Sequence, residues 1–471
     1  MIHISRRDIW WSYLAKIINS SAGLFILPFI LSMLSPEEVG YNYLLLAINS
    51  FVILIDFGFS SQIARYVSYV FSGVNKIPKT GFENLIVHNE QIDYRLLKSI
   101  VNTSKTVYRR LSLVAFFLMI SIGSYYIYHS TERFTVVHNA LLIWIIQIIA
   151  TFFNIYYLYL NSLLIGKGQV MESQQSQLAS RLFYIISSII LLYFNFGLLG
   201  ISIAYLISPF IGRFLAIKYF YDNDLQRIFE TFIISKEEKK ETFANIWYNS
   251  KKVGITLIGG FAITKIGMFM SGLYLSIDEV AQYGLMLQIS TSVTLFASTS
   301  YTALKPKLAQ LLVTKMQVQT IHYLSKAIFT FYLLFLIISI FILSCIQPLL
   351  GFINSGVSIE NKALFIFLII AFLERNHSIF ANFILLGNKV PFVNASIISG
   401  IFIIIMSYVS LELTDLGVVG LILAQGIVQL FYNNWKWPLS VLNDLDINFF
   451  NFIRTGFVQV FKSSKHEGNS I

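Results

Sequence analysis

The residues of this sequence best placed to do chemistry are charged side chains inside otherwise apolar segments. An ionisable group in hydrocarbon costs on the order of 3 kcal/mol, so a charge that is kept there usually faces a cavity or a partner. With a rise of about 1.5 Å per helical residue, Lys265, Glu374 and Arg375 lie near the middle of a bilayer. The others lie in the half of the bilayer nearer the cytoplasm, and they are Lys16, Asp56, Arg181 and Arg213.

Two structural explanations for these charges stay open beside a functional one. A long basic side chain near the membrane surface can extend its charge to the interface, and Lys265 or Arg375 could serve only to neutralise Glu374. Even then, two bases against one acid leave a cation unpaired in mid-membrane. Together with Arg181 and Arg213, this predicts a cationic cavity suited to a phosphate-bearing substrate, for which arginine is the better matched donor.

The composition indicates an integral membrane protein. Of 471 residues, 56% are hydrophobic and 12% charged, with a mean hydropathy of +0.68, which is more apolar surface than a soluble core can bury. The net charge of +10 would suggest nucleic acid for a soluble protein, but in a membrane the positions of charges matter more, and we expect no nucleic-acid partner. A lone cysteine, Cys345, scattered histidines and the lack of a phosphate-binding loop predict no metal site, no cofactor and no ATP hydrolysis.

Twelve segments are apolar over the roughly 20 residues that a helix needs to cross a bilayer. Lysine and arginine stay on the cytoplasmic side of membrane proteins, and only Arg133 and Lys362 fall in predicted outside loops. The sequence therefore predicts an all-α membrane protein with both termini in the cytoplasm. The predicted spans are about 9–33, 39–62, 107–129, 138–165, 174–195, 198–218, 253–275, 279–303, 323–346, 361–386, 390–411 and 416–436.

Three short patterns occur twice, which indicates an internal duplication. The pairs are 35–40 with 276–281, 197–204 with 417–424, and 164–166 with 385–387. The first combines a serine, two acidic residues, a valine and a small residue in register, ahead of an apolar run. The second, Gly-x-x-Gly-x-x-x-Ala, predicts a turn and a face for close helix contact. Each half holds six spans, an even number, so we expect two parallel six-helix lobes.

The duplication also divides the chain into domains. The copies of the first pattern are further apart than those of the others, because the first half carries a cytoplasmic insertion with an amphipathic run at 94–108, expected on the inner membrane surface. The expected domains are a lobe at 1–218 with the insertion 71–106, a cytoplasmic linker at 219–252, a lobe at 253–436 and a cytoplasmic tail at 437–471.

The charges inside the spans are not part of what the halves share. Lys265 has Leu24 at its equivalent position, Asp56 has Ala297, Glu374 has Phe153, and Arg375 has Asn154. A residue needed to build each bundle should occur in both halves. These differences therefore mark where we expect function.

Short motifs of the first lobe resemble a known family. Residues 27–32 (Leu-Pro-Phe-Ile-Leu-Ser), 38–40 (Glu-Val-Gly) and 56–61 (Asp-Phe-Gly-Phe-Ser-Ser) with Arg65 resemble the polysaccharide-exporter branch of the multidrug/oligosaccharidyl-lipid/polysaccharide superfamily, in particular Wzx-type O-antigen flippases. The resemblance implies a MATE-like fold and alternating access coupled to H⁺ or Na⁺. It implies a protein of the bacterial inner membrane, not an enzyme, that moves undecaprenyl-pyrophosphate-linked oligosaccharide to the outer leaflet for lipopolysaccharide or other polysaccharide biosynthesis. Membrane lipids and other polysaccharide assembly proteins are the further partners.

Under this hypothesis the cationic residues bind the pyrophosphate and acidic sugars, and one carboxylate carries the coupling ion. Asn161 and the tyrosines at 156, 157 and 159 could add sugar contacts. The substrate-binding set is Arg375, Lys265, Arg181, Arg213, Lys16 and Asn154, and the ion-coupling candidates are Asp56 and Glu374.

Two other functions stay open. A drug exporter of the same superfamily would share the architecture, but cationic drugs should prefer a cavity of negative charge. A membrane-embedded glycosyltransferase or polymerase could use Glu37 and Glu38 near the first outside loop, although these acids recur in the second half as Asp278 and Glu279.

Overall fold

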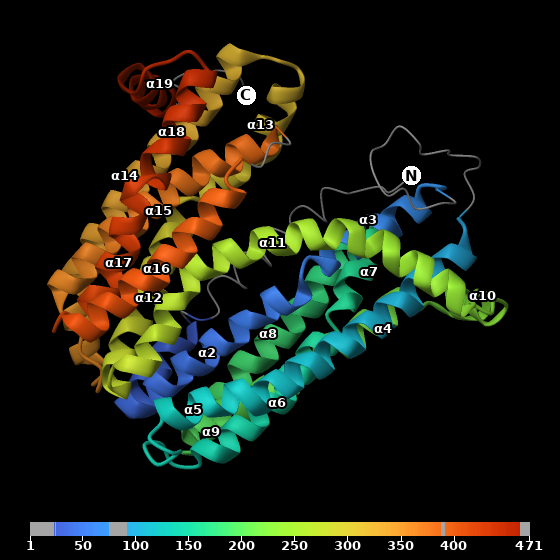
Figure 1. Ribbon diagram of the computed structural model, residues 1–471, viewed down its shortest axis with the longest axis horizontal. Coiled ribbons are helices and arrows are strands. Elements are labelled where there is room, and N and C mark those ends of the chain that lie inside the picture. Colours follow the sequence, from blue (N-terminus) through green and yellow to red (C-terminus); the bar gives the residue numbers. More distant parts are fainter. Residues whose placement is uncertain (1–22, 24, 75–91, 388–390, 462–471) are drawn as a thin grey trace, which may run out of the picture. The chain divides into compact units, whose positions relative to one another are not determined.

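The computed structural model describes residues 23, 25–74, 92–387 and 391–461, and every regular element in this part is a helix (Figure 1). The helices are α2 (Pro36–Asp56), α3 (Phe59–Phe71), α4 (Tyr94–Leu118), the π-helix η1 (Met119–Gly123), α5 (Ser124–Ser130), α6 (Ala140–Tyr156), α7 (Tyr159–Lys167), α8 (Val170–Tyr193), α9 (Gly197–Phe220), α10 (Asn223–Glu230), α11 (Lys236–Tyr274), α12 (Ile277–Ala297), α13 (Thr299–Val313), α14 (Gln317–Phe352), α15 (Asn361–Leu386), α16 (Val393–Leu413), α17 (Gly417–Phe431), α18 (Asn433–Asp444) and α19 (Phe449–Phe461).

Nine helical stretches in the described residues are long and apolar enough to cross a membrane, judged by length and composition. They coincide with nine of the predicted spans. The first predicted span lies mostly outside the described residues, and the eighth and twelfth are each divided between two shorter helices, α12 with α13 and α17 with α18. The all-helical membrane fold is thus confirmed, whereas the total of twelve spans and the side of the termini stay predictions.

The chain forms two compact units, Met1–Ile258 and Gly259–Ile471. The predicted linker is largely helical: it contains α10 and the first part of α11, which is one unbroken helix in Figure 1. This first part packs on the first unit, where Trp247 stacks on Phe57 with ring centres 5.6 Å apart and the Tyr66 hydroxyl donates to the Asn245 carbonyl at 3.0 Å. Residues 236–258 are therefore part of the first unit.

The first repeated pattern builds the same helix start in both units. Ser35 caps α2 and Ser276 caps α12; in each case the serine hydroxyl accepts from the backbone N–H three residues on. The glutamates there, Glu38 and Glu279, accept in return from the N–H of the capping serine, at 3.2 Å and 3.0 Å. This reciprocal arrangement satisfies backbone donors that a helix start leaves free.

The second repeated pattern meets the first. Gly197 and Gly417 have φ angles of +55° and +48°, which favour glycine, at the starts of α9 and α17. A Cβ atom at Gly197 would lie 2.6 Å from Glu38 Oε1, which accepts from Leu198 N at 2.9 Å, and one at Gly417 would lie 3.2 Å from Glu279 Oε1. The two patterns thus contact each other within each unit, which confirms the duplication.

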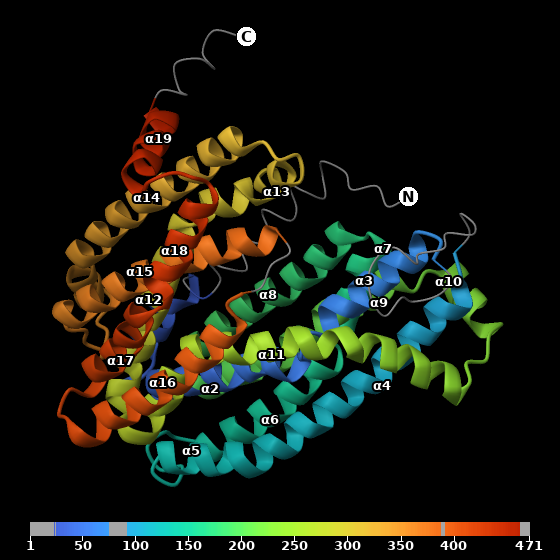
Figure 2. The same cartoon turned by 45° about the horizontal axis from the view of Figure 1, so that its top comes forward.

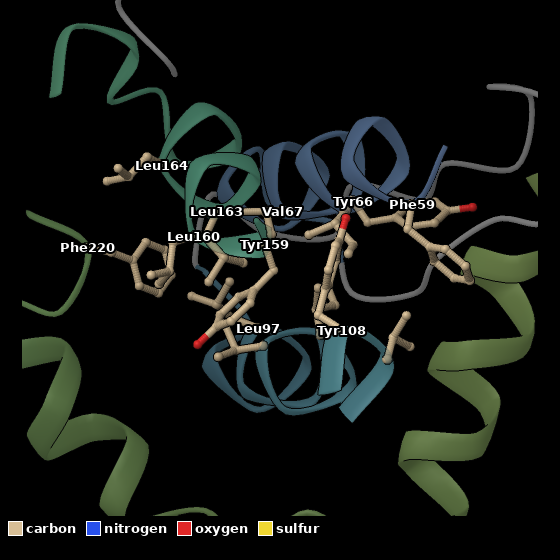
Figure 3. Packing of buried hydrophobic residues seen from close by; sticks show 14 of the residues in the cluster. Phe59, Tyr66, Val67, Leu97, Tyr108, Tyr159, Leu160, Leu163, Leu164 and Phe220 are labelled. Atoms are coloured by element: carbon tan, nitrogen blue, oxygen red, sulfur yellow. The ribbon is translucent and has the colours of Figure 1, made fainter. Parts of the chain in front are cut away.

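A hydrophobic core cluster of the first unit is formed mainly by α3, α4 and α7, with residues of α6, α9, α10 and α11 (Figure 3). Leu97, Ile100 and Tyr108 of α4 are fully buried there. The amphipathic run at 94–108 was therefore wrongly expected at the membrane surface: it is the start of a helix that continues through η1 and α5 to Ser130. Its apolar face is covered by other helices of the unit rather than by lipid head groups.

The third repeated pattern differs between the units. A Cβ atom at Gly166 of α7 would lie 2.6 Å from the Ala64 carbonyl oxygen of α3. Because this oxygen belongs to the backbone, it cannot relieve the clash by a side-chain rotation. At Gly387 the nearest atom is the Ile384 carbonyl oxygen, at 3.3 Å. Only the first of these glycines is needed for close packing of two helices.

We expect Gly166→Ala to destabilise the protein by about 1 to 3 kcal/mol, the usual cost of overpacking a core. Gly387→Ala is the matched control and should change stability by no more than about 0.5 kcal/mol. The apparent melting temperatures of the purified full-length variants in detergent measure both. Equal shifts in the two variants would contradict the assigned contact.

The second unit includes the end of the chain. Figure 2 shows α19 beside α14. Phe452 of α19 is fully buried with its ring centre 6.1 Å from that of Phe380, and a Cβ atom at Gly456 would lie 2.4 Å from the Ser325 carbonyl oxygen. The described part of the predicted tail is thus packed into the unit.

Candidate functional site

The first unit contains a pocket of about 420 Å³ between α6, α7, α8 and α9. Three of the predicted site residues line it from three helices: Asn154 of α6, Arg181 of α8 and Arg213 of α9. The lining holds no aspartate or glutamate. Its other polar side chains are Tyr157, Asn161, Ser176, Gln177, Ser180, Tyr184, Tyr205 and Ser208.

Arg213 is held by the break between α6 and α7. Its Nη2 group donates to the Phe153 carbonyl, and its guanidinium carbon lies 3.1 Å from the ring centre of Tyr157. Here the α-helical bonding ends, because Leu158 N donates to the Ile155 carbonyl at 3.1 Å rather than four residues back. The carbonyl end of a helix attracts positive charge, and an aromatic face does the same, so both position a cation.

The donors of this pocket are not all used. Arg213 Nε and Nη1 and Asn154 Nδ2 are buried and have no hydrogen-bond partner among the described residues. Arg213 is only 7% exposed, and within the same residues no carboxylate lies within 4.0 Å of it. A buried donor left unpaired costs about 1 to 3 kcal/mol, so the pocket favours a ligand that brings acceptor oxygens and negative charge.

A second pocket, of about 250 Å³, lies in the second unit. Lys265 of α11 and Glu374 and Arg375 of α15 line it, so the structure brings together the three charges predicted for mid-membrane. In the described part of the chain neither base lies within 4.0 Å of Glu374. Arg375 still interacts electrostatically with Glu374 over a longer distance, so the alternative that a base neutralises this acid stays open.

The contact of Glu374 is His377, which the sequence analysis missed. Glu374 Oε1 lies 3.8 Å from His377 Nε2, and His377 Nδ1 lies 2.7 Å from Asn434 Oδ1. His377 is 7% exposed. A spacing of three residues puts both side chains on one helical face, and that spacing was visible in the sequence.

Asp56 has a different setting. Its carboxylate accepts from Ser60 N at 3.3 Å, from the Ser60 hydroxyl at 2.7 Å and from the Tyr108 hydroxyl. It is buried and lines neither pocket, and it lies where Phe57 and Gly58 break the chain between α2 and α3, with φ angles of +48° and +78°. Lys16 lies outside the described residues.

The duplication shows that the first pocket is not a scaffold feature. Asn433 of α18 occupies the position equivalent to Arg213. Its amide donates to Ser399 Oγ at 2.8 Å and to Gln429 Oε1 at 2.7 Å, and accepts from Trp437 Nε1 at 2.9 Å. The second unit thus has a neutral amide, fully hydrogen-bonded to protein groups, where the first unit has an arginine with unpaired donors.

Comparison with known proteins gives a family and a fold. A family model described as polysaccharide biosynthesis protein matches residues 5–312. An inward-facing multidrug resistance MATE family transporter of the MOP superfamily has a similar structure, with 14% identity, 91% of this chain and 95% of that chain covered, and a TM-score of 0.63. The lipid II flippase MurJ in an inward closed conformation is similar at 15% identity, covering 98% and 93%, with a TM-score of 0.61. No curated protein matches the sequence significantly. The structural likeness is to the fold alone.

Proposed function

Because the chain belongs to the polysaccharide biosynthesis protein family, we propose that it is a flippase and not an enzyme. Its substrate is undecaprenyl-pyrophosphate-linked oligosaccharide, the repeat unit of O-antigen or a related surface polysaccharide. It moves this lipid across the bacterial inner membrane by ion-coupled alternating access. The fold shared with a MATE transporter and with MurJ supports a transport role.

The observation that carries this proposal is the set of unpaired donors in the first pocket. A pyrophosphate offers several acceptor oxygens and negative charge, and a guanidinium binds such groups through two parallel hydrogen bonds. Arg213 presents Nε and Nη1 for this contact, Asn154 adds its amide, and the exposed side chain of Arg181 adds a second positive charge. The tyrosines of the pocket are suited to the apolar faces of sugar rings.

The second pocket extends the proposed binding surface. Lys265 and Arg375 line it with hydroxyl and amide groups of α12 and α17. We assign them to acidic groups of the oligosaccharide. The pyrophosphate itself is assigned to the first pocket, where donors are buried without partners.

The alternatives explain these features less well. A cationic drug would meet two arginines and no carboxylate in the first pocket. The glutamate of a glycosyltransferase site near the first outside loop, Glu38, is already engaged by Ser35 and Leu198 at the start of two helices. The same helix-capping role is played by Glu279 in the second unit.

Transport by the full-length protein in liposomes tests the proposal. We expect undecaprenyl-pyrophosphate-linked oligosaccharide to reach the far leaflet, where an impermeant oxidant modifies its sugars, much faster than in liposomes without protein. A cationic dye given to the same vesicles should not be moved. Movement of the dye but not of the lipid would favour the drug exporter instead.

A further inference from the structure

The motif at 56–61 has no part in the substrate binding proposed above, and its backbone is strained. Phe57 and Gly58, between α2 and α3, both have left-handed backbone angles, with φ of +48° and +78°. Glycine adopts this conformation readily, but in phenylalanine the Cβ atom then crowds the backbone. A strained residue of this kind persists only where its surroundings hold it, and such residues are frequent at switches.

The first part of α11 supplies the contacts that hold Phe57. The Phe57 ring stacks on Trp247 with ring centres 5.6 Å apart, and a Cβ atom at Gly254 would lie 2.4 Å from this ring. The glycine at 254 therefore leaves the space that the ring occupies. Next to it, a Cβ atom at Gly58 would lie 2.7 Å from Val253 Cγ1. The break between α2 and α3 is thus packed tightly against α11.

The hydrogen bonds at the break can be exchanged for those of a continuous helix. Ser60 N donates to the Asp56 carboxylate at 3.3 Å, whereas in an unbroken helix it would donate to the Asp56 carbonyl, four residues back. If Phe57 and Gly58 turned to right-handed angles, α2 and α3 would join into one helix over 36–71. Both arrangements satisfy the same donor, so the contacts with α11 decide between them.

The second unit lacks this arrangement, so the fold does not require it. Ser298 has the position equivalent to Phe57, between α12 and α13, and its φ is −86°. Its N–H donates to the Thr294 carbonyl at 3.1 Å, four residues back, as in a regular helix. Ala297 replaces Asp56 there, and an alanine side chain offers no acceptor.

The break is linked to the first pocket by the packing of α3 on α7. A Cβ atom at Gly166 of α7 would lie 2.5 Å from Val67 Cβ of α3, so the two helices are in close contact. Leu160 and Asn161 of α7 line the first pocket. If α3 changes direction at Phe57, α7 must move with it or lose this contact. A change at the break therefore changes the wall of the pocket.

We propose that Phe57 is a conformational switch of the first pocket, which α11 holds in the broken state that binds the pyrophosphate. This rests on the flippase function proposed above, which supplies the ligand. When the ring leaves its place between Trp247 and Gly254, α2 and α3 join, α7 moves, and the affinity of the pocket falls. Coupling between a ligand and a conformation is reciprocal, so the bound lipid in turn favours the broken state.

The distance between two spin labels in the full-length protein, without ligand, measures the state of the break. In a Cys345→Ser background, Leu46→Cys on α2 and Ser72→Cys at the end of α3 place the labels at exposed positions. In one continuous helix the labelled residues would be about 39 Å apart. The break shortens this distance, so the two states give separate populations.

Gly254→Ala should raise the ratio of the longer to the shorter distance by about tenfold, because its Cβ atom displaces the Phe57 ring. Gly260→Ala on the same helix is the matched control: no neighbouring atom of the described residues lies within 4 Å of a Cβ there, and the distances should stay as in the wild type. Phe57→Ala loses the ring but keeps the strain, so it should also favour the longer distance. Wild-type distances in both variants, or in Phe57→Ala alone if Gly254→Ala does not fold, would overturn the switch.

Undecaprenyl-pyrophosphate-linked oligosaccharide added to the labelled protein tests the link to the pocket. In the variants that populate the longer distance, saturating lipid should restore the shorter one. Lipid that binds but leaves both populations unchanged would refute the link to the pocket. A wild type that binds no lipid would refute the proposed function instead, and the distances without ligand would still decide whether Phe57 is a switch.

Discussion

Arg213→Gln should weaken the binding of undecaprenyl-pyrophosphate-linked oligosaccharide by about 100-fold or more, because each of two lost charge-assisted hydrogen bonds contributes about 1.5 to 3 kcal/mol. Arg213 Nε and Nη1 are the buried donors available for these bonds. The ligand-induced rise in melting temperature of the purified protein measures the affinity. In cells, surface polysaccharide should fall while the amount of protein stays normal.

Two further variants make the Arg213 result specific. Arg213→Lys keeps the charge but not the planar fork of donors, so its affinity should lie between those of the wild type and Arg213→Gln. Arg181→Gln should have the smaller effect, because the Arg181 side chain is exposed, whereas that of Arg213 is buried with unpaired donors. Normal affinity in a folded Arg213→Gln protein would remove the first pocket from the mechanism.

Asp56→Ala should destabilise the protein by about 3 kcal/mol, because it removes the carboxylate that accepts from Ser60 N, from the Ser60 hydroxyl and from the buried Tyr108 hydroxyl. Asp56→Asn keeps an acceptor oxygen and should lose far less stability. Melting temperatures and protease resistance in detergent distinguish the two variants. Both effects follow from a carboxylate that holds the break between α2 and α3.

Transport by Asp56→Asn adds a second test of the same residue. If Asp56 only stabilises the helix break, transport by this variant should still respond to an imposed H⁺ or Na⁺ gradient as transport by the wild type does. A folded Asp56→Asn protein that moves lipid but no longer responds to the gradient would instead support the coupling role that the sequence predicted for Asp56. The stability and transport measurements therefore assign the residue independently.

Local patterns of the sequence predicted the scaffold well. The serine and glutamate of each first pattern form a helix cap within four residues, so their role needs no distant contact. The amphipathic run at 94–108 was misplaced because an apolar stripe packs equally well against lipid or other helices, and only the tertiary fold shows that Leu97 and Tyr108 are buried.

The candidate sites were predicted in part. Their charged residues were identified because charges are costly in apolar segments, but their grouping depends on which helices adjoin. The structure puts Asn154, Arg181 and Arg213 in one pocket and Lys265, Glu374 and Arg375 in another. The unpaired donors of Arg213 and the link from His377 to Asn434 depend on side-chain directions that no spacing specifies.

The contact between the two repeated patterns has a historical consequence. In both units a glutamate of the first pattern lies beside a glycine of the second, Glu38 beside Gly197 and Glu279 beside Gly417, as expected if this arrangement existed before the ancestral gene was doubled. Arg213 and the pair of Glu374 with His377 have no such counterparts, and each distinguishes one half from the other. The ancestor, with identical halves, would have had matching pockets on both sides. Doubling the gene freed each copy to specialise in its own way.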